Sequence, residues 1–215
     1  HTNFTSFTVR NAGWTNWEQD NGIRLRGTQS SQVTDCIVSG CAYGIREMMG
    51  GSNVINGNTV SNCTEIAIGS SHATTRDDIV VNNIITNCKN GIYFNSPYNI
   101  QILGNAISNM TGEEAKYGIH FEGGGSNNIV VGNTIMGYTD YGIAIRYADE
   151  NFVSGNTLLN NFYGIELGQS SCDNTITENN VSDNGVGISV FDNSNNNLIT
   201  MNDFSDSVPV GFYIS

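Results

Sequence analysis

Apolar and polar residues alternate in short segments that recur along the whole chain. A glycine and an isoleucine mark most of these segments, and a second apolar residue follows two positions later, as in Gly22-Ile23-Arg24-Leu25. The glycines of these pairs are Gly22, Gly44, Gly91, Gly118, Gly142, Gly164 and Gly187, and Glu65-Ile66 and Gly211-Phe212 fill the two remaining slots. Because a period of two is typical of a strand with one buried face, each segment predicts a short β-strand.

Asparagine is the second recurring residue, 13 or 14 positions after the isoleucine in most units. Its positions are Asn58, Asn83, Asn105, Asn133, Asn156, Asn179 and Asn202. Stacked asparagine side chains hydrogen-bond along a repeat axis, and asparagine tolerates the left-handed backbone of a tight corner. We therefore interpret these residues as a structural ladder.

The spacing of the repeat varies between 21 and 27 residues and carries no helical signature. It predicts an all-β fold, a single-stranded right-handed parallel β-helix of about nine coils, as one domain over residues 1–215. One strand breaks the pattern, because Glu47 stands where the other coils place an apolar residue. Either a bulge at this point or a buried acid with a partner would explain it.

With these motifs the chain resembles the parallel β-helix repeat family, the pectate-lyase-like superfamily. Its members include polysaccharide lyases, polygalacturonases, mannuronan epimerases and archaeal disaggregatases. The Gly-Ile and Gly-Asn-Thr motifs are coil-building residues shared by members with different chemistry, so they indicate the fold and not the reaction. The Asp-Pro-His signature of the epimerases and the paired aspartates of the polygalacturonases are absent from this sequence. The asparagine-rich, lysine-poor composition looks most like archaeal surface-polysaccharide proteins.

Composition narrows the possible partners. The 215 residues carry a formal net charge of −12 and only eight Lys and Arg residues, which argues against a nucleic-acid partner. No run of eighteen apolar residues occurs, so we expect no membrane insertion. Of the five cysteines, Cys41, Cys63 and Cys88 fall at one equivalent position, which favours a column of buried thiols. Equivalent Cα atoms in adjacent coils lie about 5 Å apart, so disulfides stay open as an alternative.

The outward positions of the glycine–isoleucine strands gather half of the basic residues. Arg24, Arg26, Arg46 and Arg146 occupy four of these positions in an otherwise acidic chain. Guanidinium groups suit carboxylate or sulfate groups, so this face predicts an anionic polysaccharide as partner. Ion pairing with acids of adjacent coils is the alternative. We predict as substrate-binding residues Arg24, Arg26, Arg46, Asn95, Tyr147, Trp14 and Trp17.

The middle coils of the same face carry side chains suited to proton transfer and charge stabilisation. We predict as catalytic residues Tyr93, His120, Glu122, Arg146 and Glu166. Glycoside hydrolysis with Glu122 and Glu166 as the acidic pair is ranked slightly first, because the resemblance to disaggregatases implies it. A polysaccharide lyase that uses His120, Tyr93 and Arg146 on a uronic-acid polymer is the alternative, and a non-catalytic carbohydrate-binding or surface-layer module is a third.

Loops and chain ends complete the hypothesis. Insertions at residues 11–20, 69–78 and 111–116 are placed to wall a groove along this face. Asp77 and Asp78 allow calcium near the groove, but no cofactor or metal is predicted. Neither end of the chain carries a polar cap, so we expect flanking segments of a longer secreted protein, or a homo-oligomer, to cover the solenoid. The expected location is extracellular or at the cell surface.

Overall fold

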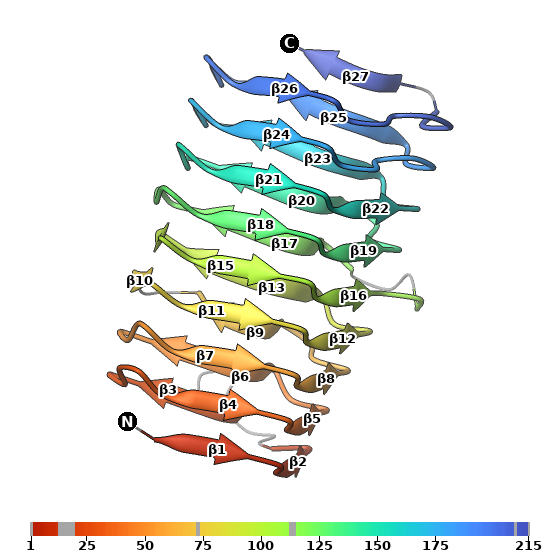
Figure 1. Ribbon diagram of the computed structural model, residues 1–215. Coiled ribbons are helices and arrows are strands. Elements are labelled where there is room, and N and C mark those ends of the chain that lie inside the picture. The colour runs from red at the N-terminus through yellow and green to blue at the C-terminus, as the bar shows by residue number, and fades with distance from the viewer. Residues whose placement is uncertain (1, 13–19, 72–73, 112–114, 209, 215) are drawn as a thin grey trace.

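The computed structural model describes residues 2–12, 20–71, 74–111, 115–208 and 210–214 (Figure 1). Within these ranges the chain forms short β-strands and no helix, so it also contains no helix long and apolar enough to cross a membrane. Figure 1 shows the coils stacked in sequence order from the N-terminus to the C-terminus. All paired strands are parallel, and the predicted all-β parallel β-helix is confirmed.

Three long sheets run along the stack. Sheet A consists of β1 (Asn3–Thr5), β4 (Gln32–Thr34), β7 (Val54–Asn56), β11 (Ile79–Val81), β15 (Gln101–Leu103), β18 (Ile129–Val131), β21 (Phe152–Ser154), β24 (Thr175–Thr177) and β26 (Leu198–Thr200). Sheet B consists of β2 (Thr8–Arg10), β5 (Ile37–Ser39), β8 (Thr59–Ser61), β12 (Ile84–Thr86), β16 (Ala106–Ser108), β19 (Thr134–Met136) and β22 (Thr157–Leu159). The first seven coils pass through A, then B, then C, and the last two have strands in A and C alone, because sheet B ends at β22.

Sheet C carries the glycine–isoleucine repeat. Its strands are β3 (Asn21–Arg26), β6 (Tyr43–Met48), β9 (Ile66–Ser70), β13 (Asn90–Asn95), β17 (Tyr117–Glu122), β20 (Tyr141–Arg146), β23 (Tyr163–Gly168), β25 (Val186–Val190) and β27 (Val210–Ile214). A small fourth sheet pairs β10 (Thr75–Arg76) with β14 (Pro97–Tyr98).

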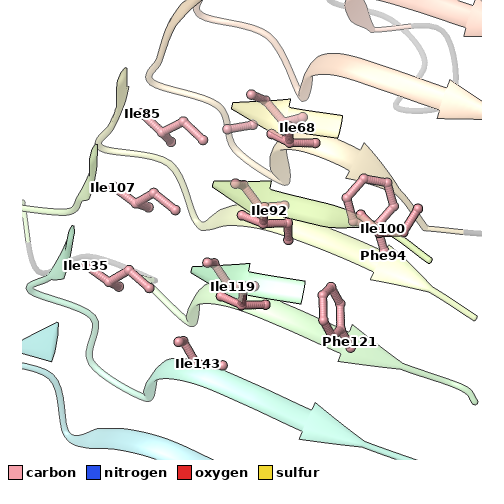
Figure 2. Close-up of a cluster of buried hydrophobic side chains, with 14 of the residues drawn as sticks. Ile68, Ile85, Ile92, Phe94, Ile100, Ile107, Ile119, Phe121, Ile135 and Ile143 are labelled. Atoms are coloured by element: carbon pink, nitrogen blue, oxygen red, sulfur yellow. The ribbon is translucent and has the colours of Figure 1, made fainter. Parts of the chain in front are cut away.

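The core is a narrow column between the three sheets. In the inner coils, the middle residue of each strand of sheets A and B is buried, and sheet C adds two inward residues per strand. Figure 2 shows Ile92 and Ile119 of sheet C stacked coil on coil, opposite Ile107 and Ile135 of sheet B. Burial of such stacked aliphatic side chains stabilises each coil against its neighbours.

The repeated glycine is required by close packing. A Cβ atom on Gly118 would lie 2.3 Å from Cγ2 of Ile135 and 2.5 Å from the carbonyl oxygen of Gly142 in the next coil. The backbone of Gly118 is not left-handed, so steric room and not unusual dihedral angles selects glycine here.

One strand of sheet C lies in a different register from the predicted one. Ile68, and not Ile66, pairs with Ile45 on one side and with Ile92 on the other. The sequence expectation for Glu65-Ile66 was therefore wrong by two residues. Ala67 takes the place of the repeated glycine, and Gly69 takes the first outward position.

The asparagine ladder is confirmed. Asn83 is a typical link, because its side-chain oxygen accepts from the backbone and side-chain nitrogens of Asn58, and its own Nδ2 donates to Oδ1 of Asn105 at 2.9 Å. The left-handed residue of the corner is not the ladder asparagine but the residue before it, such as Asn82 or Gly104. A second ladder, which the sequence analysis did not identify, links Asn128, Asn151, Asn174 and Asn197.

The exceptional Glu47 is a buried acid with partners. It pairs with Leu25 in regular register, so no bulge forms, and its side chain is fully buried. Asn53 donates its side-chain amide to Glu47 and its backbone nitrogen to Asp78. Burial, followed by the hydrogen bond and the charge of Asp78, raises the pKa of Glu47 to about 10. Burial also raises the pKa of Asp78.

The predicted column of buried thiols is confirmed. Cys41, Cys63 and Cys88 are free thiols with at most 2% of their surface exposed. Burial raises the pKa of the Cys41 thiol, and a side-chain hydrogen bond with Cys88 together with burial raises that of Cys63. These cysteines therefore pack as small core residues.

Candidate functional site

The outer face of sheet C brings the predicted site residues into register. Tyr93 on β13 pairs with His120 on β17, and Asn95 pairs with Glu122 on the same two strands. Further along the sheet, Ala144 on β20 pairs with Glu166 on β23. Residues 20 to 30 positions apart in sequence thus become neighbours on one surface, in the predicted order.

His120 is enclosed, although its strand position faces outward. Only 1% of its surface is exposed, because the ring of Tyr117 stacks on it at 4.0 Å and Tyr93 packs edge-on at 5.0 Å. Burial, and then the charge of Arg146, lowers the pKa of His120 to about 3. Neither ring nitrogen has a hydrogen-bond partner among the described residues, and Nε2 lies 3.9 Å from Oε2 of Glu122. His120 is therefore a neutral, buried imidazole near neutral pH.

Tyr93 and Glu122 form a hydrogen-bonded pair at the edge of this cluster. The Tyr93 hydroxyl donates to Oε2 of Glu122 at 2.6 Å, and the Glu122 side chain is 38% exposed. Burial, followed by the hydrogen bond and charge of Glu122, raises the pKa of Tyr93. Tyr93 thus keeps its proton and presents it to a carboxylate that solvent and ligands can reach.

Arg146 and Glu166 form a bidentate ion pair across adjacent strands. Nε and Nη2 of Arg146 donate to the two carboxylate oxygens at 2.7 and 3.0 Å, and Glu166 is fully buried. Nη1 of Arg146 donates to the hydroxyl of Tyr117 at 3.0 Å. Burial alone would lower the pKa of Arg146, but the hydrogen bonds and charge of Glu166 outweigh it and raise that pKa. Arg146 therefore forms an ion pair with an acid of the next coil, which was the alternative to ligand binding in the sequence analysis.

Three stacked tyrosines, which the sequence analysis missed, cover this ion pair. Tyr117, Tyr141 and Tyr163 stack with ring centroids 5.4 and 5.0 Å apart, and the Arg146 guanidinium lies 4.9 Å from the Tyr141 ring. Because the ring faces cover one another, a ligand meets ring edges and hydroxyls instead of an open stacking platform. The recurring Tyr-Gly-Ile at residues 117–119, 141–143 and 163–165 was the available signal.

A shallow hollow lies beside the last two rings of this ladder. It has a volume of about 300 Å³ and is lined by Thr139, Asp140, Tyr141, Phe162 and Tyr163. Phe162 packs edge-on against Tyr163 at 4.9 Å and keeps 56% of its surface exposed.

The predicted arginines do not form one continuous basic face. Arg24 and Arg26 on β3 are exposed, whereas Arg46 on β6 is 3% exposed and packs over the Tyr43 ring at 4.0 Å. β9, β13 and β17 separate these strands from Arg146 on β20. The face therefore has an arginine-rich end near the N-terminus and a mixed polar centre.

Of the predicted binding residues not yet placed, Tyr147 lies within the described part of the chain. Tyr147 is 53% exposed and occupies a left-handed position (φ 53°) directly after β20. Trp14 and Trp17 lie outside the described residues, as do parts of the three insertions expected to wall a groove. Asp77 hydrogen-bonds Asn99 at the surface while Asp78 is buried against Glu47, so the two aspartates do not act together. Within the described ranges, no three His, Cys, Asp or Glu side chains are grouped as a metal ion requires.

Two family models match this chain. One, described as "Right handed beta helix region", covers residues 75–215, and the other, described as "Periplasmic copper-binding protein (NosD)", covers residues 2–135. The chain belongs to the right-handed β-helix family. The search of curated proteins gave no match.

Solved structures share the fold of this β-helix protein. A mutant of the periplasmic alginate epimerase AlgG aligns with a TM-score of 0.81 and 18% identity, over 98% of this chain and 58% of that one. The A-module of the Azotobacter vinelandii mannuronan C-5 epimerase AlgE6 aligns with a TM-score of 0.72 and 12% identity, over 99% and 72%. The Dettilon tailspike protein gives 0.52 and 11%, over 100% and 61%. This chain thus spans little more than half of the AlgG chain, and these likenesses concern the fold alone.

Proposed function

We propose that this β-helix protein acts on an anionic polysaccharide outside the cytoplasm, by lyase-type proton transfer on the outer face of sheet C. The epimerases above are named for alginate and mannuronan, which supports a polysaccharide substrate for a similar solenoid. NosD and AlgG are both described as periplasmic, which supports the location. The function of a site depends on its residues more than on its fold.

The Tyr93–Glu122 hydrogen bond is the observation that carries the proposal. Glu122 is the accessible carboxylate that takes the proton from the carbon bearing the sugar's carboxylate. The bond to the adjacent glycosidic oxygen then breaks, a carbon–carbon double bond forms, and the proton of Tyr93 goes to the leaving oxygen. Glu122 returns its proton to Tyr93 through their shared hydrogen bond. Because both groups lie side by side, acid and base approach one face of the sugar, which favours syn elimination.

Hydrolysis has weaker support from this geometry. A glycosidase requires two carboxyl groups, one of them protonated or free to act as base or nucleophile. Glu166 is fully buried and accepts two hydrogen bonds from Arg146, so it is held away from a substrate as a counter-ion. Glu122 is then left without a carboxyl partner among the described outward positions of the glycine–isoleucine strands.

Copper, which the NosD description names, does not fit the described residues. Soft copper ions select deprotonated thiol, thioether or imidazole ligands. The Cys41–Cys63–Cys88 column is buried, the pKa values of the Cys41 and Cys63 thiols are raised, and His120 is a single enclosed imidazole. We therefore assign no step to copper.

Product analysis on a panel of polymers tests the proposal. The purified protein is incubated with alginate, pectate and glucuronan, and with neutral glucan and mannan as controls. Ultraviolet absorbance of unsaturated ends is the expected result on at least one acidic polymer. New reducing ends without absorbance would indicate hydrolysis, and inverted sugar units detected by NMR would indicate epimerisation. Either result would overturn the lyase assignment, and silence with retained binding would favour the non-catalytic module.

Two variants locate the reaction on the face. Glu122→Gln and Tyr93→Phe each remove one proton-transfer group and keep its shape, so turnover should fall about 100-fold or more. Glu65→Gln, a partly exposed acid 3.6 Å from Lys89, is the matched control and should leave turnover unchanged. Equal activity of Glu122→Gln and Glu65→Gln would place the chemistry elsewhere.

A further inference from the structure

Arg146 has hydrogen-bond donors left over after its contacts within the protein. A guanidinium carries five N–H groups in a fixed planar arrangement. Nε, one N–H of Nη2 and one N–H of Nη1 are used, for Glu166 and for Tyr117. One N–H remains on each of Nη1 and Nη2, and the side chain is 16% exposed. Two neighbouring N–H groups are the pattern that a carboxylate accepts in a bidentate contact.

The orientation of these two donors is fixed before any ligand binds. Glu166 holds the guanidinium from β23 and Tyr117 holds it from β17, so the strands on both sides of β20 contribute. The rings of Tyr117 and Tyr141 lie 5.4 and 4.9 Å from the guanidinium carbon. Such a clamp reduces the conformational entropy that a flexible arginine loses on binding.

Tyr117 also lies between Arg146 and the part of sheet C that carries Tyr93 and Glu122. Its ring stacks on His120 at 4.0 Å, and Nε2 of His120 lies 3.9 Å from Oε2 of Glu122. A sugar whose carboxylate is held by Arg146 would therefore lie on the same patch of sheet C as Tyr93 and Glu122.

We propose that Glu166 and Tyr117 are positioning residues that aim the two remaining donors of Arg146 at the carboxylate of a uronic-acid unit. This inference rests on the proposed function and names the group that the site recognises. Because Glu166 neutralises Arg146, recognition depends on directed hydrogen bonds more than on net charge. The site then distinguishes an acidic sugar from a neutral one of the same shape, with little dependence on salt.

Binding to a matched pair of ligands tests this inference. The first ligand is a uronate hexasaccharide, and the second is the same chain with its carboxylates reduced to neutral alcohols. Titration calorimetry is done in the Glu122→Gln background, so that the ligand is not consumed. Arg146→Lys keeps the positive charge and loses the planar pair of N–H donors. The affinity of this variant for the acidic chain should fall about tenfold or more, and its affinity for the reduced chain should not change.

Tyr117→Phe isolates the positioning role, because it removes one hydroxyl and keeps the ring stack. Affinity for the acidic chain should fall about threefold to tenfold, again without effect on the reduced chain. Tyr213→Phe, which removes an exposed hydroxyl on β27 at the far edge of sheet C, is the control and should bind as the parent does. Equal melting temperatures of the two tyrosine variants would show that folding is not the cause.

The outcomes separate this inference from the proposed reaction. Unchanged acidic-chain affinity in both Arg146→Lys and Tyr117→Phe overturns the inference, even where Glu122→Gln abolishes turnover. Loss of acid-selective binding in these variants supports it, even where no product forms and the reaction fails. Equal loss for the acidic and the reduced chain would mean a merely structural role and would also overturn it.

Discussion

Two glutamates of sheet C are both fully buried, yet their surroundings differ completely. Glu47 on β6 points into the core, next to Asp78 and Asn53. Glu166 on β23 lies on the outer face, held by Arg146 under stacked tyrosines. Neither carboxyl touches water, so each has replaced its hydration with protein partners.

The partner decides what each buried acid does. Beside a second carboxyl, Glu47 retains a proton, which makes its coil sensitive to pH. Beside a guanidinium, Glu166 serves as a counter-ion and fixes the direction of Arg146. The same residue type in the same sheet thus stores a proton in one place and orients a charge in the other.

Replacing Arg146, the cationic partner of Glu166, should have the largest effect on stability. Arg146→Met leaves a fully buried carboxylate without its partner, and the free energy of unfolding at neutral pH should fall by about 3–5 kcal/mol. Urea denaturation followed by circular dichroism measures it. The double variant Arg146→Met/Glu166→Leu removes both charges and should recover most of the loss; a single variant as stable as the parent would contradict the role of the ion pair.

Replacing Glu47 by glutamine, which cannot ionise, should stabilise the protein at alkaline pH. A carboxyl with a raised folded pKa contributes stability at low pH and loses it as pH rises toward that pKa, here about 10. The parent should therefore lose stability steadily above about pH 5, and Glu47→Gln should lose less. At about pH 8 the variant should be more stable by about 1–3 kcal/mol, measured by melting temperature across the pH range. A steeper decline of stability with pH in the variant would contradict the coupling of Glu47 to Asp78.

Replacing Asp78, the acid next to Glu47, should give a smaller gain in stability. Asp78 accepts a bond from the backbone of Asn53 as the ladder asparagines do, so Asp78→Asn keeps that acceptor and supplies an amide donor for Glu47. A gain of about 1 kcal/mol is expected near neutral pH, together with a flatter pH profile. Chemical denaturation at two pH values checks both, and a destabilised variant would mean that the carboxyl itself is needed there.

An exposed acid should show the smallest effect. Glu65 is 43% exposed at its side chain and lies 3.6 Å from Lys89. Glu65→Gln should change the free energy of unfolding by less than about 0.5 kcal/mol, because water screens such a pair. A loss above about 1 kcal/mol would mean that burial is not what separates the three glutamates.

Much of the fold could be predicted from the sequence, because every coil repeats the same packing requirement. The glycine–isoleucine pair and the ladder asparagine each answer to a contact with the next coil, so their spacing reveals the solenoid. The register of β9 could not be predicted as easily. Ile66 and Ile68 are two residues apart and share one strand face, and only the stacking of Ala67 against its neighbours distinguishes them.

The candidate site could be predicted in outline only. Strand alternation indicated correctly which side chains leave the outer face, and pairing placed Tyr93 beside His120. The burial of these side chains depends instead on the way in which long side chains from neighbouring strands pack over them. Tyr117 encloses His120, 3 positions away in sequence, and Arg146 binds Glu166, 20 positions away. The catalytic and binding roles stay predictions for the experiments above.

The asparagine ladder gives the solenoid an inherent direction. Each side-chain amide donates one N–H to the asparagine of the following coil and accepts at its oxygen from the asparagine of the preceding coil, as Asn105 does between Asn83 and Asn133. The amide dipoles therefore add head to tail, and each link polarises the next. A coil transplanted from another solenoid would extend this chain of dipoles only if it carried an asparagine at the same corner. A coil without one would interrupt this chain of side-chain hydrogen bonds and leave two shorter ladders.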